Sequence, residues 1–272
     1  NVDKYVETRM HNVTLQYHSG VGFDVGGDYT HYTSDNNQTL LADYADGGQS
    51  SFSIIGGQKI DRYSIYADRK RHLAKEWNLG YGISYRFAKD RDFQTYDKVT
   101  GDIPTENTDS RLREQTANFY VSLSRNYATG TSVSVSATGE YYTIGGYRKW
   151  AVYPQASLTY VKSPKHLFQL SLSTDKTYPG YWDMQSSVSH LNGYTELWGT
   201  PGLKPSTTYN LNGNYIWKQK YIFGLFFMHT SDFFVQTGYQ STDRLALIYK
   251  NTNWNYMQMW GANIILPFKA GN

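Results

Sequence analysis

The chain has 272 residues, a formal net charge of +3, no cysteine, and aromatic residues at 17% of its length. The lack of cysteine excludes disulfides and thiolate metal sites, and so small a net charge argues against a nucleic-acid-binding protein. The mean hydropathy is −0.61, and no apolar run approaches the roughly 18 residues of a membrane-spanning helix. A transmembrane barrel stays possible, because its strands are apolar only at every second position.

Alternation of apolar and polar residues predicts about twelve strands along the chain. The first six are expected at residues 13–18, 21–32, 59–70, 77–87, 118–124 and 132–141. In the fourth of these, Leu79, Tyr81 and Ile83 share one face. The polar stretches 33–50 and 88–111 are expected to be loops.

Two further strands are predicted at residues 148–161 and 166–174, although Pro154 counts against a central position for the first of them. A long segment containing Pro179, Pro201 and Pro205 then interrupts the alternation. Such long connections are usually functional in compact domains. Four more strands follow, in two pairs that turn near Gln219–Lys220 and Thr252–Asn253 respectively.

The connections and the two faces of the strands indicate the fold class. Short turns are expected after every odd-numbered strand and longer links after every even-numbered strand, so the two kinds gather at opposite ends of the sheet, as in outer-membrane barrels. The polar faces are rich in Ser, Thr, Asn and Gly, and the apolar faces carry Tyr and Trp, which is typical of a wet lumen and a lipid-facing belt. The sequence therefore predicts an all-β, antiparallel transmembrane β-barrel. A soluble β-sandwich binding module stays open as an alternative.

A block in the second half carries a family resemblance. It reads Tyr-Pro-Gly-Tyr-Trp-Asp-Met at 178–184 and Gly-Thr-Pro-Gly-Leu-Lys-Pro at 199–205, and a Tyr-rich strand begins at Thr207. This block resembles the TonB-dependent outer-membrane receptors of Bacteroides-like bacteria, in the outer membrane protein β-barrel family. The chain reads Thr177-Tyr178-Pro179 where the family would have Arg-Pro, and Thr200 replaces the usual Asn. The positions that match its motif are Pro179, Tyr181, Gly199, Pro201, Leu203, Lys204 and Pro205.

The resemblance implies a barrel of about 22 strands with a plugged lumen, of which residues 1–272 would be a barrel segment without the plug domain. It implies import of a nutrient ligand across the outer membrane of a Gram-negative bacterium. The expected partners are outer-membrane lipid, the plug domain and the energy-coupling protein of the parent receptor. A complete, smaller outer-membrane barrel acting as an enzyme or adhesin is the other interpretation.

Chemistry-bearing motifs are sparse. The 7 histidines are scattered without metal-ligand spacing, and no nucleophile or phosphate-loop motif is present, so we expect no enzyme activity, no cofactor and no metal site. Tyr181, Trp182, Tyr194 and Trp198 form a candidate ligand-contact cluster, because exposed aromatic side chains can grip a ligand. They could equally pack the long segment onto its neighbours. Asp24, Asp28 and Glu140 lie on polar faces and could line a ligand path, although lumen-facing carboxylates are more commonly paired with Arg.

Overall fold

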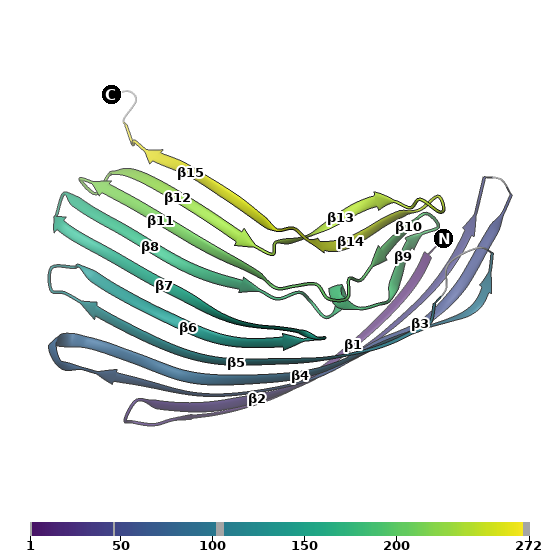
Figure 1. The fold of residues 1–272 in the computed structure, drawn as a ribbon, viewed down its shortest axis with the longest axis horizontal. Coiled ribbons are helices and arrows are strands. Elements are labelled where there is room, and N and C mark those ends of the chain that lie inside the picture. Colours follow the sequence, from purple (N-terminus) through teal and green to yellow (C-terminus); the bar gives the residue numbers. More distant parts are fainter. Residues whose placement is uncertain (1, 46, 102–105, 269–272) are drawn as a thin grey trace.

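The computed structural model describes residues 2–45, 47–101 and 106–268, which fold almost entirely into β-strands (Figure 1). Eleven strands form one large sheet in which each strand pairs antiparallel with the next. In their order across the sheet they are β1 (Val2–His18), β2 (Phe23–Asp43), β3 (Gln49–His72), β4 (Trp77–Thr100), β5 (Thr108–Asn126), β6 (Ser132–Ile144), β7 (Tyr147–Ser163), β8 (His166–Thr177), β11 (Ser206–Trp217), β12 (Tyr221–Ser231) and β15 (Tyr256–Ile265).

Four shorter strands form a second sheet at one end of the large one (Figure 1). In their order across this sheet they are β13 (Phe234–Gln240), β14 (Leu247–Asn253), β10 (Thr195–Trp198) and β9 (Val188–Asn192). Two 3₁₀ turns complete the structure, η1 (Ala74–Glu76) and η2 (Trp182–Met184). The long segment between β8 and β11 therefore contains regular structure. The predicted turn at Thr252–Asn253 joins strands of different sheets rather than a hairpin within one.

The large sheet is a curved, open wall. β1 forms one edge and β15 the other, and these two edges do not pair with each other in the described part of the chain. An open edge presents a row of unpaired backbone groups, which closure into a barrel removes. The prediction of an antiparallel barrel wall belonging to a larger barrel is confirmed.

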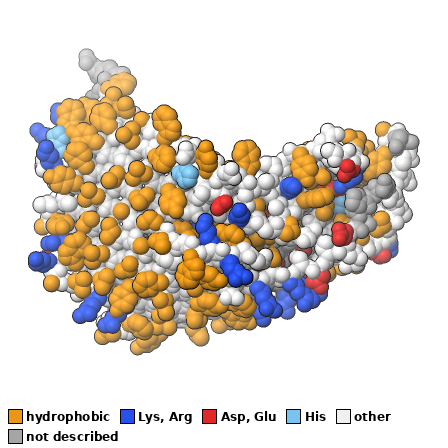
Figure 2. All heavy atoms as spheres, in the orientation of Figure 1, with side chains coloured by type: hydrophobic (Ala, Val, Ile, Leu, Met, Phe, Trp, Pro, Cys, Tyr) orange, Lys and Arg blue, Asp and Glu red, His pale blue; other side chains and the backbone are white. Residues whose placement is uncertain are grey.

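Apolar side chains cover the convex face of this wall near the short turns. Ile83 is 58% exposed, Leu225 69% and Trp260 80%. Figure 2 shows hydrophobic side chains spread over the left part of the molecule, with Lys and Arg along the left margin, where the short turns lie. A soluble sandwich would cover such a face with a second sheet. None of the described residues does so here, so the sandwich interpretation is wrong.

Strands β2, β3 and β4, of 21, 24 and 24 residues, extend well beyond the membrane. A transmembrane strand needs about 9–11 residues, which takes β4 from Trp77 to about Phe87, yet β4 continues to Thr100. Residues 33–50 and 88–111, which we predicted to be loops, are accordingly mostly strand. The apolar face changes sides in this extension, because water now lies outside and the smaller sheet lies inside. The side chains buried on the inner face include Leu40, Phe52 and Ile54.

The connections differ from the predicted alternation of short and long. Short turns do gather at one end of the wall, but β6 and β7 are joined at the other end by Gly145 and Gly146 alone. Their φ values of 53° and 93° suit a tight hairpin turn that glycine adopts readily. That end is larger because of the strand extensions and because two segments leave the wall there. These two excursions, the one between β8 and β11 and the one between β12 and β15, form the smaller sheet. Pro154 sits in β7 just beyond Ala156, where the ladder to β8 ends, so its missing N–H interrupts nothing.

Candidate ligand-binding site

Residues 178–205 are anchored to the inner face of the wall. Met184 and Leu203 pack with Tyr142 and Ile144 of β6 in a buried cluster. The neighbouring side chain on β6, Tyr141, lies on the opposite face against the exposed Trp150. Because neighbouring residues of a strand point to opposite faces, the cluster lies on the lumen side. The segment is therefore folded inside the wall.

An ion pair on the same face fixes the start of this segment. Lys176 and Glu140 form a salt bridge with side chains only 9% and 5% exposed. Tyr178 also donates to Glu140, and Tyr153 donates to it across 3.3 Å. The Lys176 ammonium lies 4.3 Å from the ring centre of Tyr142, where the π face attracts a cation. Of the three carboxylates expected to line a ligand path or to pair with an arginine, Glu140 pairs with a lysine. This lysine lies on β8 beyond Leu172, where the ladder between β7 and β8 ends.

A second carboxylate holds the next turn of the segment. The Tyr181 hydroxyl donates to Glu114 of β5, and Arg86 of β4 lies 4.0 Å from the same carboxylate. The Tyr181 side chain is therefore held against the wall and does not face an approaching ligand.

The motif residues pack the segment together at its centre. Pro179, Leu203 and Pro205 are buried. A Cβ at Gly199 would lie 2.1 Å from the carbonyl oxygen of Gln185, so only glycine fits there. These four motif positions hold the polypeptide in place.

The other motif positions lie against β14. The backbone N–H of Lys204 donates to the side-chain oxygen of Asn253 at 2.8 Å, and the Asn253 amide donates back to the Lys204 carbonyl at 3.0 Å. The Thr200 hydroxyl donates to the Asn251 carbonyl at 2.6 Å, so threonine at this position makes a specific contact. Pro201 is exposed beside them. This half of the motif therefore joins the two excursions into one external layer.

A cavity of about 400 Å³ lies between this external layer and the end of β2. Its floor is a trio formed by the buried His190 and Glu196 and the half-buried Arg244. Both terminal nitrogens of Arg244 donate to Glu196 at 2.6 Å, the bidentate geometry that makes such pairs strong. Nδ1 of His190 lies 3.6 Å from the same carboxylate. The trio brings together β9, β10 and the connection between β13 and β14.

Burial and charge set the protonation of this trio, which lies outside the membrane. Burial lowers the pKa of His190 by more than the neighbouring Glu196 raises it. The neutral imidazole is therefore favoured. Burial raises the pKa of Glu196, but hydrogen bonds from Arg244 and Trp198 outweigh it and lower the pKa overall. The pocket thus holds a neutral histidine beside a paired carboxylate and guanidinium.

The predicted aromatic cluster is divided between several places. Tyr194 lines the 400 Å³ cavity and meets Tyr44 edge-on at 5.3 Å between ring centres. Trp198 donates to Glu196 at 2.8 Å, behind the cavity. Trp182 is 38% exposed and covers a different, smaller cavity. With Tyr181 held by the wall, Tyr194 is the member of the predicted cluster that borders the large cavity in the described part of the chain.

The polar groups of the cavity were missed by sequence reasoning. His190 and Glu196 are six residues apart, whereas Arg244 follows Glu196 by 48 residues, and this spacing carries no motif. Other charged residues, among them Asp183, Asp243 and Lys250, lie in the same two segments, so the charges of Glu196 and Arg244 gave no local signal.

The sequence profile of the outer membrane protein beta-barrel family matches residues 18–272. The chain belongs to this family. Its place is therefore the outer membrane of a Gram-negative bacterium, with the exposed apolar face toward lipid. A comparison with curated proteins finds no match.

Solved structures with the same fold are outer-membrane receptors and transporters. The ferric enterobactin receptor of Pseudomonas aeruginosa, as a mutant, is 13% identical with a TM-score of 0.57, over 95% of this chain and 40% of the receptor. The siderophore receptor PirA of the same species is 12% identical with a TM-score of 0.52, over 97% and 54%. The copper transporter OprC is 11% identical with a TM-score of 0.60, over 97% and 44%. The chain thus spans about half the length of these proteins, and the likeness concerns the fold.

Proposed function

We propose that this chain forms part of the barrel wall of a TonB-dependent receptor that imports a nutrient ligand through a plugged lumen. Two observations support a larger barrel. The edges β1 and β15 are unpaired in the described part of the chain, whereas a complete small barrel would join them. The matched receptors are about twice as long as this chain.

The polar inner face supports an inner domain, and this observation carries the proposal. A cavity of about 290 Å³ opens on this face between β2, β3, β4 and β5. Its lining includes the charged and polar side chains of Asp28, Arg62, Arg86 and Asn118. A plug domain packed against the wall would find hydrogen-bond partners there.

The external cavity supports ligand capture. Its volume of about 400 Å³ lies within the range of small-molecule sites, and it combines aromatic walls with a few fixed polar groups, as such sites do. It lies at the end of the wall away from the short turns, which in outer-membrane barrels is the outer side. We infer that Tyr44 and Tyr194 make the first contact with the imported ligand.

Crosslinking within the full-length receptor tests the barrel assignment. A photo-reactive residue replacing Asn118, on the inner face, should crosslink to the receptor's own plug domain, whereas the same residue at Phe119, on the outer face, should not. Equal crosslinking at both positions, or crosslinking only at Phe119, would contradict the proposed plugged wall.

Growth tests address import. A strain lacking the receptor should grow poorly when one nutrient is limiting, among iron chelates, copper, cobalamin and oligosaccharides. The intact receptor should restore growth, and a receptor carrying Tyr44→Ala and Tyr194→Ala should restore it less well while still showing heat-modifiable migration on a gel. Normal growth of the deletion strain under every limitation would count against import.

A further inference from the structure

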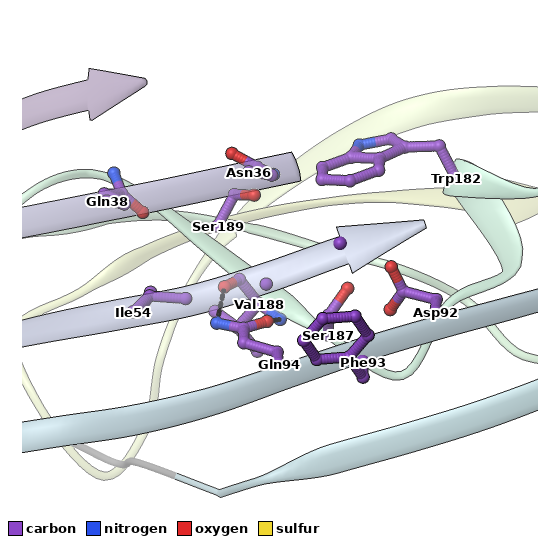
Figure 3. Close-up of a pocket in the computed structure, with 12 residues that line it drawn as sticks. Asn36, Gln38, Ile54, Asp92, Phe93, Gln94, Trp182, Ser187, Val188 and Ser189 are labelled. Atoms are coloured by element: carbon purple, nitrogen blue, oxygen red, sulfur yellow. Dashed lines mark hydrogen bonds between the residues drawn. The ribbon is translucent and has the colours of Figure 1, made fainter. Parts of the chain in front are cut away.

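Five exposed cationic side chains lie on the outer face of the wall, directly beyond its lipid-facing band. We call them the basic patch, and they are Lys59 of β3, Lys89 and Arg91 of β4, and Arg111 and Arg113 of β5. On β4, Asp90 and Asp92 are 2% and 3% exposed on the inner face, where Asp92 lines a small cavity with Ser187 (Figure 3). Because neighbouring residues of a strand point to opposite faces, Lys89 and Arg91 point outward.

The strand register sets these cations side by side. Lys59 is opposite Arg91, which is in turn opposite Arg111. In the next row toward the membrane, Lys89 is opposite Arg113. Side chains directly opposite each other in antiparallel strands have Cβ atoms about 4.5–5.5 Å apart, and like charges at such positions are destabilising. An anion bound from outside would relieve this repulsion.

The carboxylates near the basic patch neutralise only part of its charge. Asp109 lies 2.9 Å from Arg91 and 3.6 Å from Arg111. Asp61 lies 2.7 Å from His31 and pairs with that residue. The other three cations of the patch form no ion pair in the described part of the chain. The patch therefore keeps an excess of positive charge.

The basic patch lies at the level of the lipid headgroups. Directly below it, Tyr63 of β3 is opposite Phe87 of β4, and Tyr63 stacks on Tyr29 at 4.8 Å between ring centres. Such aromatic girdles mark the membrane–water interface of barrels. Lys89 and Arg91 follow Phe87 by two and four residues, which raises them about 5 and 9 Å in a strand tilted by about 45°. Figure 2 shows Lys and Arg side chains gathered low in the middle of the molecule, where its hydrophobic left part ends.

We propose that the basic patch binds the phosphate groups of lipopolysaccharide, the glycolipid of the outer leaflet of the Gram-negative outer membrane. The patch faces that leaflet, because it lies on the side of the lipid-facing band away from the short turns. Arginine binds phosphate with two parallel hydrogen bonds and lysine binds it as a point charge, so the patch offers both kinds of contact. The acyl chains of the same lipid would lie against the apolar band below. The proposal is independent of import, because a wall that transports nothing would still meet this lipid.

Native mass spectrometry of the full-length receptor in detergent tests the proposal. The probe is rough lipopolysaccharide, which has a short carbohydrate chain, and the comparison is the same lipid after its phosphates have been removed. The phosphorylated lipid should stay bound, and the dephosphorylated lipid should bind at least about tenfold more weakly. Equal binding of the two lipids, or no binding of the phosphorylated one, would overturn the proposal.

Double variants locate the binding. Lys89→Gln with Arg113→Gln should weaken binding about 25-fold, because each Lys or Arg close to an anionic lipid surface strengthens binding roughly fivefold. These changes remove like charges that face each other, so the receptor should keep its heat-modifiable migration on a gel. Lys59→Gln with Arg111→Gln is a second, independent pair and should weaken binding in the same direction.

The matched control removes the same charge at the other membrane boundary. Arg69→Gln with Arg71→Gln changes two exposed arginines of β3 near its short turn, and this variant should bind the lipid as the unmodified receptor does. An equal loss of binding in the control and in the two patch variants would overturn the proposal, as would unchanged binding in both patch variants.

Discussion

Removing the Glu140 carboxylate should release the long segment from the inner wall. Glu140→Gln keeps the shape of the side chain but leaves the Lys176 ammonium, 9% exposed, without its counter-ion. Breaking a buried pair on one side costs about 3–5 kcal/mol, whereas replacing both partners with neutral groups is often close to neutral. The double variant Glu140→Gln with Lys176→Met should therefore recover most of the loss.

Hydrogen exchange of residues 178–192 in the full-length receptor measures this loss. If the segment opens locally, a cost of 3–5 kcal/mol should speed exchange between about a hundredfold and a few thousandfold, since about 1.4 kcal/mol corresponds to a factor of ten. Asp109→Asn is the control: Asp109 and Arg91 are 2.9 Å apart, but their side chains are 44% and 53% exposed, and such pairs contribute under about 1 kcal/mol. Equal exchange in Glu140→Gln and Asp109→Asn, or a double variant as labile as Glu140→Gln, would refute the reasoning.

Gly82→Ala should destabilise the barrel by about 1–3 kcal/mol, the usual cost of overpacking, because a Cβ there would lie 2.0 Å from Asp68 and 2.6 Å from Tyr120. Gly20→Ala, with open space around it, should be neutral in the same urea unfolding experiment in lipid vesicles, and equal midpoints would contradict this. Acid should loosen the smaller sheet. Burial lowers the pKa of His190 in the folded protein, whereas the imidazole exposed by opening has its ordinary pKa of about 6.5 and takes up a proton below it. Hydrogen exchange in β9 should therefore rise as pH falls from about 6.5 to 5, and His190→Gln should flatten this rise; an unchanged slope in that variant would contradict the assignment.

The membrane-spanning part of the fold was predictable because its alternation has one physical cause throughout. From Leu79 to Phe87 every second side chain meets lipid, and the sequence shows it directly. In the extensions the same strands bury Leu40, Phe52 and Ile54 on the opposite face, mixed with polar groups such as Asp92. The alternation of apolar and polar residues therefore breaks where a strand leaves the membrane, and for this reason the extensions were predicted to be polar loops.

The external site was less predictable, because it is assembled from distant segments. The motif residues were found from their resemblance to a family, and the structure places them where they hold the segment against the wall and β14. Tyr194 was identified because aromatic residues in a long connection stand out. Nothing local indicates that Arg244 meets Glu196, since this contact depends on how the two excursions fold back onto the wall.

Site-directed spin labelling along β4 tests the central claim most directly, that one face of each strand meets lipid and the other an aqueous lumen. The chain contains no cysteine, so single variants Ile83→Cys, Ser84→Cys, Tyr85→Cys and Arg86→Cys can each be labelled in the full-length receptor in bilayers. Collision with oxygen, which concentrates in lipid, should be high at 83 and 85 and low at 84 and 86. The reverse alternation, or uniform accessibility at all four positions, would contradict the account.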